Sequence, residues 1–372
     1  MRNKRLLVRS LIIASWAAIL FLPFKGIRGA AELFLVIAAG IPVFHFLQRG
    51  MVLPKHFRSV VSFLRPFFIP VFLIAALAVP FLAGDYYLDV LIMCGIYILL
   101  ALGLNVIVGF AGLLNLGFAA FYAIGAYIYG LLNTKLGIGF WPCLPVSAAG
   151  TACAGLLVAV PALRLRGDYL AIVTLGFGEI LRLVLNNWDS VTNGPNGISG
   201  IAPPQLAGIS LGNLKYFYYL VLAIVLLSVF VIRRVERSRT GRAWIALREN
   251  EIAASSIGIN VTRYKLYAFA FGSFWAGIAG ILFAAKMRFI SPESFTFAES
   301  VLILSMVILG GTGNIYGAIA GAFLLVLLPE VLREVQLYRM LILGIGLVLL
   351  MIFKPEGLLG KNLRKIRQPV ED

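Results

Sequence analysis

The chain has 372 residues, of which 61% are hydrophobic and only 13% are charged. A soluble globular domain carries roughly 25% charged residues, so this composition excludes an ordinary soluble fold. Apolar runs recur that are long enough for a hydrocarbon core about 30 Å thick, and runs such as VLAIVLLSVFVI (residues 221–232) lack the alternation of a β-barrel strand. The sequence therefore predicts an all-α fold, a polytopic transmembrane helical bundle.

The formal net charge is +16, and the basic residues are unevenly distributed. Lysine and arginine collect on the cytoplasmic side of a membrane, because moving them across it is unfavourable. The basic stretches lack interleaved aromatic residues, which disfavours nucleic-acid binding and favours cytoplasmic loops. These stretches are the N-terminus, the loop 48–65, residues 164–166, the loop 233–265 and the tail after residue 353.

Three cysteines and two histidines show no metal-ligand or disulfide spacing. We therefore expect no metal site in this chain. A membrane enzyme would need an acid–base or metal cluster at membrane depth, and the scarcity of His, Cys and Asp argues against one.

The apolar runs predict about 10 to 12 membrane segments. The first resembles a signal peptide but lacks a convincing cleavage site, so we interpret it as a retained helix. We expect an accessory hairpin and basic loop over residues 1–65, a core over 66–360 and a basic cytoplasmic tail over 361–372. The predicted spans are residues 10–24, 29–47, 66–83, 86–104, 105–131, 144–163, 168–185, 216–232, 266–286, 300–309, 315–328 and 338–353.

One predicted segment, residues 300–309, is too short to cross a bilayer alone. It and the next segment are expected to form a broken or re-entrant pair around GGTGNIYG. Gly313, Gly317 and Gly321 repeat at four-residue spacing, and small residues at this spacing let two helix backbones approach closely in lipid.

The long connection over residues 186–215 is rich in Gly, Pro, Asn and Ser, so turns and loop are predicted on the external side. It is too small for a ligand-binding domain, which implies that a separate receptor delivers any solute. Asn193 and Asn196 lie in an external turn that either contacts such a receptor or simply reverses the chain. Lys286 and Glu299, near the outer surface, are expected to be solvated.

The basic loop 233–265 contains a predicted cytoplasmic helix over residues 242–257, capped by Thr240. Its apolar residues are expected to anchor a partner protein, its small residues to allow close approach, and its arginines, including Arg248, to meet acidic groups of that partner. A helix lying on anionic lipid headgroups is the alternative interpretation. The residues predicted to make the partner contact are Arg242, Trp244, Leu247, Glu251, Ala253, Ala254 and the helix-ending Gly258.

The segment ENEIAASSIGI (residues 249–259) resembles the EAA-type coupling loop of ABC transporter permeases, which docks into a groove of the ATPase subunit. Four longer blocks resemble the LivM-type permeases of branched-chain amino acid uptake systems, and this likeness covers about residues 85–359. The blocks are residues 102–127, 174–198, 239–260 and 310–322.

This resemblance implies the membrane subunit of an importer for leucine, isoleucine or valine, located in the bacterial cytoplasmic membrane. Alternation of the spans and the distribution of basic residues predict that both termini are cytoplasmic. The resemblance also implies two ATPase subunits, a second related permease and a periplasmic or lipid-tethered binding protein as partners. We expect no cofactor in this chain, with ATP and magnesium used by the ATPase. The sequence agrees, since it contains no G-x-x-x-x-G-K-[ST] phosphate loop.

Two other kinds of transporter remain open. Permeases for urea or short amides are close relatives of this family, so the solute is not decided by the sequence. A stand-alone secondary transporter also explains the helices, but it leaves the predicted docking helix unexplained.

Three polar residues are candidates for the solute path. Glu179 lies within an apolar segment, where ionisable groups are functional hypotheses by default. Arg182 follows one helical turn later, so an internal ion pair is the simpler account and solute contact is the alternative. Asn105 and Asn115 flank a glycine-rich step, where they either line a passage or, as we favour, tie helices together by hydrogen bonds.

Overall fold

The computed structural model describes residues 77, 80–81, 84–163, 165, 167–206, 209–331, 344, 348 and 357–358. The chain divides into two units, Met1–Val79 and Pro80–Asp372, and all described residues except Leu77 belong to the second. The predicted accessory hairpin and basic loop (1–65), the basic tail (361–372) and nearly all of the predicted last span lie outside the described residues.

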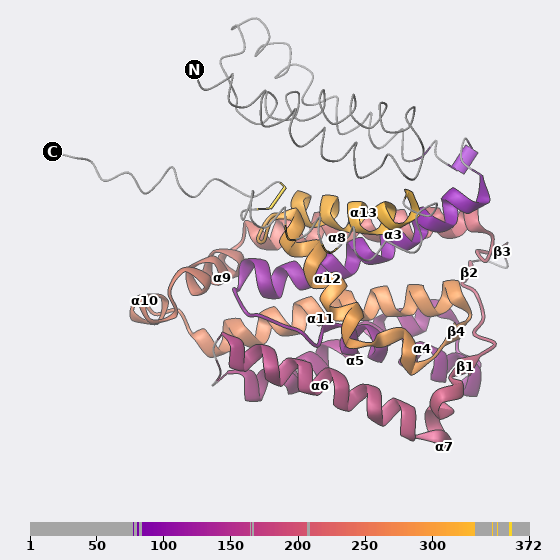
Figure 1. Cartoon of the computed structure of the whole chain (residues 1–372), viewed down its shortest axis with the longest axis horizontal. Coiled ribbons are helices and arrows are strands. Elements are labelled where there is room, and N and C mark those ends of the chain that lie inside the picture. The colour runs from indigo at the N-terminus through magenta and orange to yellow at the C-terminus, as the bar shows by residue number, and fades with distance from the viewer. Residues whose placement is uncertain are drawn as a thin grey trace, which may run out of the picture. The chain divides into compact units, whose positions relative to one another are not determined.

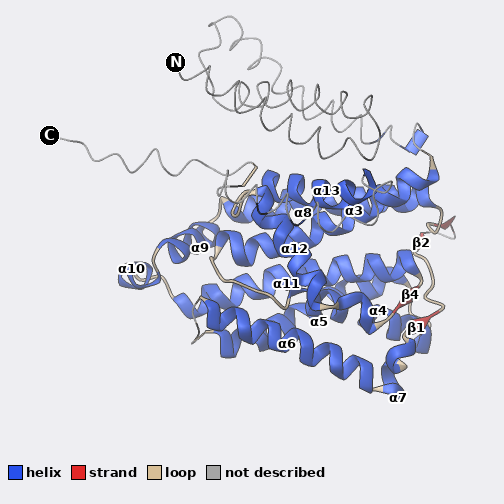
Figure 2. Ribbon diagram, in the orientation of Figure 1, coloured by secondary structure: helices blue, strands red, loops and turns tan. Residues whose placement is uncertain are grey.

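Helices dominate the described part of the chain (Figures 1 and 2). Four strands of two residues each are the exception: β1 (Ile198–Ser199), β2 (Gln205–Leu206), β3 (Ile209–Ser210) and β4 (Phe289–Ile290). The helices are α3 (Asp85–Leu104), the π-helix η1 (Asn105–Phe110), α4 (Phe118–Leu136), α5 (Phe140–Ala162), α6 (Asp168–Asn187), α7 (Asp189–Thr192), η2 (Gly194–Asn196), α8 (Leu214–Glu236), α9 (Arg239–Glu249), α10 (Glu251–Ser256), α11 (Val261–Met287), η3 (Pro292–Phe295), α12 (Phe297–Gly310) and α13 (Ile315–Val331).

Five of the described segments are long and apolar enough to cross a membrane. A charged side chain is costly inside the bilayer, and these segments contain few. The prediction of an all-α, polytopic membrane fold is thus confirmed. The five segments are Asp85–Phe110, Phe140–Pro161, Leu214–Glu236, Val261–Met287 and Pro292–Gly310.

Helix α11 is the most enclosed of these five segments and packs against α3, α4 and α5. Small residues make this packing close. A Cβ atom on Gly125 of α4 would lie 2.5 Å from the Cα atom of Gly277 of α11, closer than real Cβ atoms come to their neighbours. The two backbones are therefore in direct contact, as small residues allow between helices in lipid.

Helices α12 and α13 form the broken pair that the sequence predicts. The turn between them contains Gly311 and Gly313, both with positive φ. A Cβ atom on Gly317 would collide with the carbonyl oxygen of Gly310, and one on Gly321 with that of Met306. The predicted close approach at Gly317 and Gly321 is confirmed. Gly313 also lies close to a backbone, that of Gly109, and beside the Arg248 side chain described below.

The predicted continuous span over residues 105–131 is wrong. Its first six residues prolong α3 as η1, and α4 begins only at Phe118. Between them the chain runs in a non-helical segment through Gly112, whose φ of 71° is in the left-handed region that favours glycine. Apolar composition alone did not reveal this interruption.

The connection between α6 and α8 is more ordered than the predicted loop. It contains α7, η2 and three of the short strands. Strand β1 pairs antiparallel with β4, with Ile198 opposite Ile290, and thus joins this connection to the end of α11. The isoleucine pair is buried, which explains why a Gly- and Pro-rich segment holds one conformation here.

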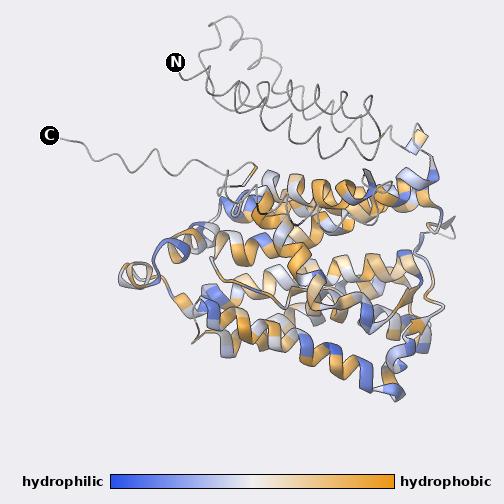
Figure 3. Cartoon of the chain, in the orientation of Figure 1, coloured by the Kyte–Doolittle hydropathy of each residue, from blue (hydrophilic) through white to orange (hydrophobic). Residues whose placement is uncertain are grey.

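Residues of high hydropathy occur along most helices of the bundle (Figure 3), and several large apolar side chains among them are exposed. Ile172 and Ile180 of α6 are each 63% exposed, and Phe230 of α8 is 66% exposed. Extended apolar surface of this kind suits lipid or another membrane helix rather than water.

Candidate coupling site and solute path

The predicted cytoplasmic helix is two helices, α9 and α10, which lie at one end of the bundle (Figure 1). Ser238, not the expected Thr240, caps α9 by accepting a hydrogen bond from the Gly241 amide at 3.4 Å. Asn250 caps α10 by accepting hydrogen bonds from the amides of Ile252 and Ala253 at 2.9 and 3.0 Å.

The single helix predicted over residues 242–257 is therefore wrong, because Asn250 adopts an extended conformation and starts a second helix. The predicted end is confirmed. Helix α10 ends at Ser256, and Gly258 follows with a φ of 85°.

Three of the predicted contact residues are buried inside this chain: Trp244 is 1% exposed, Leu247 6% and Ala254 2%. The Trp244 indole nitrogen donates a hydrogen bond to the Tyr264 carbonyl oxygen at 2.8 Å, which holds α9 against α11. The expectation that Trp244 and Leu247 anchor a partner is thus wrong, because these side chains attach the two helices to the bundle.

The outward face of α9 and α10 carries a different apolar set. Ile245 is 42% exposed, Ile252 66% and Ile257 74%. Arg242, Ala253 and Gly258 are also exposed. Helical spacing could have indicated these isoleucines, but sequence alone does not tell which of two apolar faces turns inward.

Glu251 and Lys265 join α10 to α11. The Lys265 ammonium lies 2.6 Å from a Glu251 carboxylate oxygen, and the two side chains are 4% and 21% exposed. Removing one partner of a buried ion pair leaves an uncompensated charge, so each residue depends on the other. Lys265 was not a predicted site residue, since no sequence spacing links it to Glu251.

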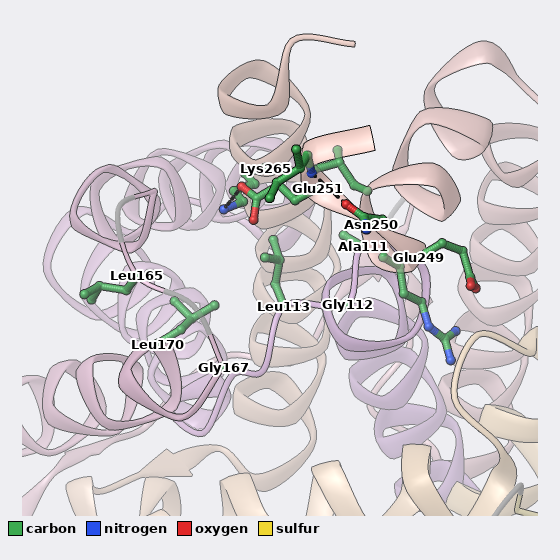
Figure 4. Close-up of a pocket in the computed structure, with 13 residues that line it drawn as sticks. Ala111, Gly112, Leu113, Leu165, Gly167, Leu170, Glu249, Asn250, Glu251 and Lys265 are labelled. Atoms are coloured by element: carbon green, nitrogen blue, oxygen red, sulfur yellow. Dashed lines mark hydrogen bonds and ion pairs between the residues drawn. The ribbon is translucent and has the colours of Figure 1, made fainter. Parts of the chain in front are cut away.

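Glu251 and Lys265 also line a cavity of about 310 Å³ at this end of the bundle (Figure 4). One side of the cavity is formed by α9 and α10, and the other by the two connections that precede α4 and α6. Gly112 and Leu113 come from the first connection, and Gly167 from the second. The loop helices thus face the same interruption that divides η1 from α4.

Arg248 links α9 to both broken regions of the bundle. Its guanidinium donates hydrogen bonds to the Gly109 carbonyl oxygen at 2.5 Å and to the Thr312 hydroxyl at 3.4 Å. Its side chain also packs against Gly112, where a Cβ atom would lie 2.9 Å from the arginine Cγ. Arg248 is nevertheless exposed, so contact with a partner's acidic groups stays a prediction.

Asn105 also contributes to the place where Arg248, η1 and the α12–α13 turn meet, which we call the Arg248 junction. Its side-chain oxygen accepts a hydrogen bond from the Gly313 amide at 2.8 Å, which ties η1 to the α12–α13 turn. For Asn105, the prediction that it ties helices together by a hydrogen bond is thereby confirmed. Asn115 instead caps its own turn, accepting from the Gly117 amide at 2.9 Å. Both asparagines are fully buried, and neither side-chain NH2 group has a hydrogen-bond partner in the described part of the chain.

The predicted ion pair in α6 is confirmed, because Arg182 Nε lies 3.0 Å from Glu179 Oε2. Arg182 also reaches Glu293 of η3 at 3.6 Å. The Glu179 side chain is 34% exposed, so the pair lies at the edge of the bundle and not in its centre. Solute contact by Glu179 stays a prediction.

The expectation that Lys286 and Glu299 are solvated is wrong. The Lys286 side chain is 8% exposed and lies 3.0 Å from the Asp89 carboxylate. One carboxylate oxygen of Glu299 is fully buried. Their positions near helix ends suggested exposure, but the packing of α3 against α11 and α12 encloses both groups.

The turn predicted around Asn193 and Asn196 is present. Asn193 has a φ of 62° and donates a hydrogen bond from its side-chain nitrogen to the Gly197 carbonyl oxygen at 3.0 Å. Asn193 and Asn196 are both exposed. Reversal of the chain therefore accounts for Asn193, and contact with a receptor stays a prediction.

Apolar helices long enough to span a membrane, with a two-helix loop attached at one end, define a multi-pass membrane protein. Residues 86–352 match the family model of the branched-chain amino acid transport system permease component. This chain belongs to that family.

The chain is 50% identical over 315 residues to the high-affinity branched-chain amino acid transport system permease protein LivM of Salmonella typhimurium and to that of Escherichia coli K12. Each alignment covers 78% of this chain and 74% of the relative. It is also 25% identical to LivH of the same Salmonella system, over 71% of this chain and 91% of the relative. No solved structure matches the chain.

Proposed function

We propose that this chain is the membrane-spanning permease subunit of an ATP-driven importer of branched-chain amino acids. Its membership of the permease family and its 50% identity to the two LivM proteins support this function. The observation that carries the proposal is the α9–α10 pair, a polar loop structure held rigidly to the bundle and exposing isoleucines.

The partners follow from this function. Two ABC ATPase subunits would hydrolyse ATP with magnesium, and a solute-binding protein outside the membrane would deliver the amino acid. A second permease would complete the membrane part, and similarity to LivH supports a related but different chain.

The orientation follows from charge. The end of α8 and the start of α9 carry Arg233, Arg234, Arg237 and Arg239, so this end of the bundle faces the cytoplasm by the positive-inside rule. By the same rule, we expect the basic segments near both chain termini to be cytoplasmic.

The ATPase docking surface comprises the exposed residues Arg242, Ile245, Ile252, Ala253, Ile257 and Gly258. Isoleucine side chains that are solvent-exposed in the free subunit gain free energy when a groove covers them. Small residues at Ala253 and Gly258 allow the groove wall to approach the α10 backbone.

Movement of the ATPase reaches the bundle through two contacts. The Glu251–Lys265 pair connects α10 to α11, and Arg248 connects α9 to η1 and to the α12–α13 turn. Displacement of α9 therefore acts on the glycine-rich breaks, and the packed helices rock between inward-open and outward-open arrangements.

Uptake by the assembled transporter tests the function. The chain is reconstituted in proteoliposomes with its ATPase, partner permease and binding protein, and labelled leucine, urea and propionamide are compared. We expect ATP-dependent uptake of leucine. Preferential uptake of urea or propionamide would show that the solute is an amide and not a branched-chain amino acid. Gradient-driven uptake by this chain alone would show a secondary transporter and not an ATP-driven importer.

Replacing Ile252 with aspartate is expected to prevent assembly with the ATPase. The change places a carboxylate in the proposed apolar contact, and each buried isoleucine contributes about 1.5–3 kcal/mol. The ATPase retained by the purified permease measures the effect, and we expect at least about a tenfold loss.

Thr262→Asp is the matched control, because Thr262 is exposed at the same end of the molecule but outside the docking surface. Equal retention of the ATPase by the Ile252→Asp variant and the control would contradict the proposed contact.

A further inference from the structure

A carboxylate with an unused oxygen lies inside the bundle between α3, α4 and α12. Glu299 is in the first turn of α12, and its Oε1 atom is buried and has no hydrogen-bond partner among the described residues. The Tyr97 hydroxyl of α3 lies close enough to this carboxylate to interact with it. A buried carboxylate that keeps one oxygen free is unfavourable unless another group binds it.

A second unused polar group lies near Glu299. Tyr122 of α4 is 1% exposed, and its hydroxyl is buried with no hydrogen-bond partner in the described part of the chain. Tyr122 is close enough to interact electrostatically with both Tyr97 and Glu299. Three helices therefore direct one carboxylate and two phenol groups toward the same region.

Aromatic rings surround this region. The Tyr122 ring centroid lies 5.0 Å from that of Phe295 and 5.2 Å from that of Phe283, and the two phenylalanine centroids are 5.9 Å apart. Aromatic ring faces attract cations, most strongly where water is excluded. Carboxylate, phenol and ring faces together are the chemistry that recognises an ammonium group.

The depth of Glu299 suits a translocation site. Eleven residues separate it from Gly310, the end of α12 beside the Arg248 junction, which corresponds to about 16 Å along the helix. At the other end of the bundle, Asp89 pairs with Lys286, and eight residues or about 12 Å separate Asp89 from Tyr97 along α3. Glu299 thus lies near the middle of a hydrocarbon core about 30 Å thick.

The chain is also interrupted at this point. Thr296 is extended between η3 and α12, which separates the two helices and puts Glu299 in the first turn of α12. A helix N-terminus favours a negative charge. Transporters commonly place solute sites near the bilayer midplane at such discontinuous helices.

We propose that Glu299, with the hydroxyls of Tyr97 and Tyr122, binds the ammonium group of the amino acid as it crosses the membrane. The inference rests on the proposed function, because it requires an amino acid as the solute. It adds a recognition site within the permease itself, separate from the docking surface of α9 and α10.

Glu299→Gln tests the site, since it keeps the shape of the side chain and removes its charge. The reconstituted transporter is supplied with leucine-loaded binding protein, and leucine moved per ATP hydrolysed is measured. We expect at least about a tenfold lower ratio, because a charge-assisted hydrogen bond is lost, while ATPase activity stays within about twofold of wild type. Tyr122→Phe, which removes only a hydroxyl, is expected to lower the ratio less.

Glu293→Gln is the matched control, because Glu293 precedes the same helix but its side chain is 70% exposed. An unchanged ratio in both Glu299→Gln and Tyr122→Phe would overturn the inference and leave the proposed function intact. Parallel loss of uptake and ATPase activity would also overturn it, since that pattern indicates a structural role. Failure of the wild-type transporter to move leucine would instead refute the proposed function.

Discussion

Replacing Arg248 with alanine is expected to abolish leucine uptake while the ATPase still binds and hydrolyses ATP. The side chain is the contact that joins α9 to the Gly109 carbonyl and the Thr312 hydroxyl. Without it, movement of the docking helices no longer acts on the breaks in the bundle. We expect uptake to fall by at least about tenfold, since hydrogen bonds from a charged donor contribute about 1.5–3 kcal/mol.

Arg248→Lys separates charge from geometry in the same assay. Lysine keeps the positive charge, but a single ammonium does not reproduce the planar fork that reaches two acceptors in different segments. We therefore expect Arg248→Lys to remain strongly impaired. Arg263→Ala, at an exposed position near the start of α11, serves as the control. Normal uptake by Arg248→Ala, or full activity of Arg248→Lys, would contradict the role of this junction.

Replacing Glu251 with lysine is expected to destabilise the attachment of α10 and to stop uptake. The new ammonium would face Lys265, whose side chain is 4% exposed and loses its counter-ion. Breaking a buried ion pair costs about 3–5 kcal/mol, and the repulsion adds to this loss. Thermal unfolding of the purified subunit measures the stability, and the uptake assay measures the function.

The double exchange Glu251→Lys with Lys265→Glu restores opposite charges at the same two positions. We expect it to recover most of the lost stability and part of the uptake, because the charges remain adjacent. A double variant no more stable than Glu251→Lys would show that the ion pair does not hold α10 to α11.

The sequence predicts the fold class well because composition and run length are direct consequences of burial in lipid. It also predicts the Glu179–Arg182 pair, since both residues lie on one helix at a spacing of three. The end of the loop helix at Gly258 is also predictable, because glycine readily adopts the positive φ that often ends a helix, and this preference is local in sequence.

Contacts between distant segments are what the sequence does not predict. Trp244 was expected to contact a partner protein, because it lies in a polar loop. In the structure its side chain is buried and hydrogen-bonded to α11. Arg248 was expected to meet acidic groups of a partner, and no local pattern predicts its hydrogen bonds within this chain. Its acceptors come from Gly109 and Thr312, which are 139 and 64 residues away in sequence.

Glu299 illustrates the same limit for the candidate solute path. A charged residue near a helix start suggests exposure, and the sequence carries no sign that Tyr97 and Tyr122 lie beside it. Only the packing of α3, α4 and α12 brings one carboxylate and two phenol groups together. Its burial with a free oxygen is what distinguishes it from an ordinary surface acid.

A photoreactive amino acid in place of Ile252 tests most directly whether α9 and α10 form the ATPase docking surface. Ile252 is 66% exposed on α10, and Ile172, 63% exposed on an apolar face of α6, is the comparison position. On irradiation of intact cells, we predict a covalent product with the ATPase subunit from position 252 and none from position 172. Absence of that product from position 252, or a product only with a protein on the external side of the cytoplasmic membrane, would contradict the account.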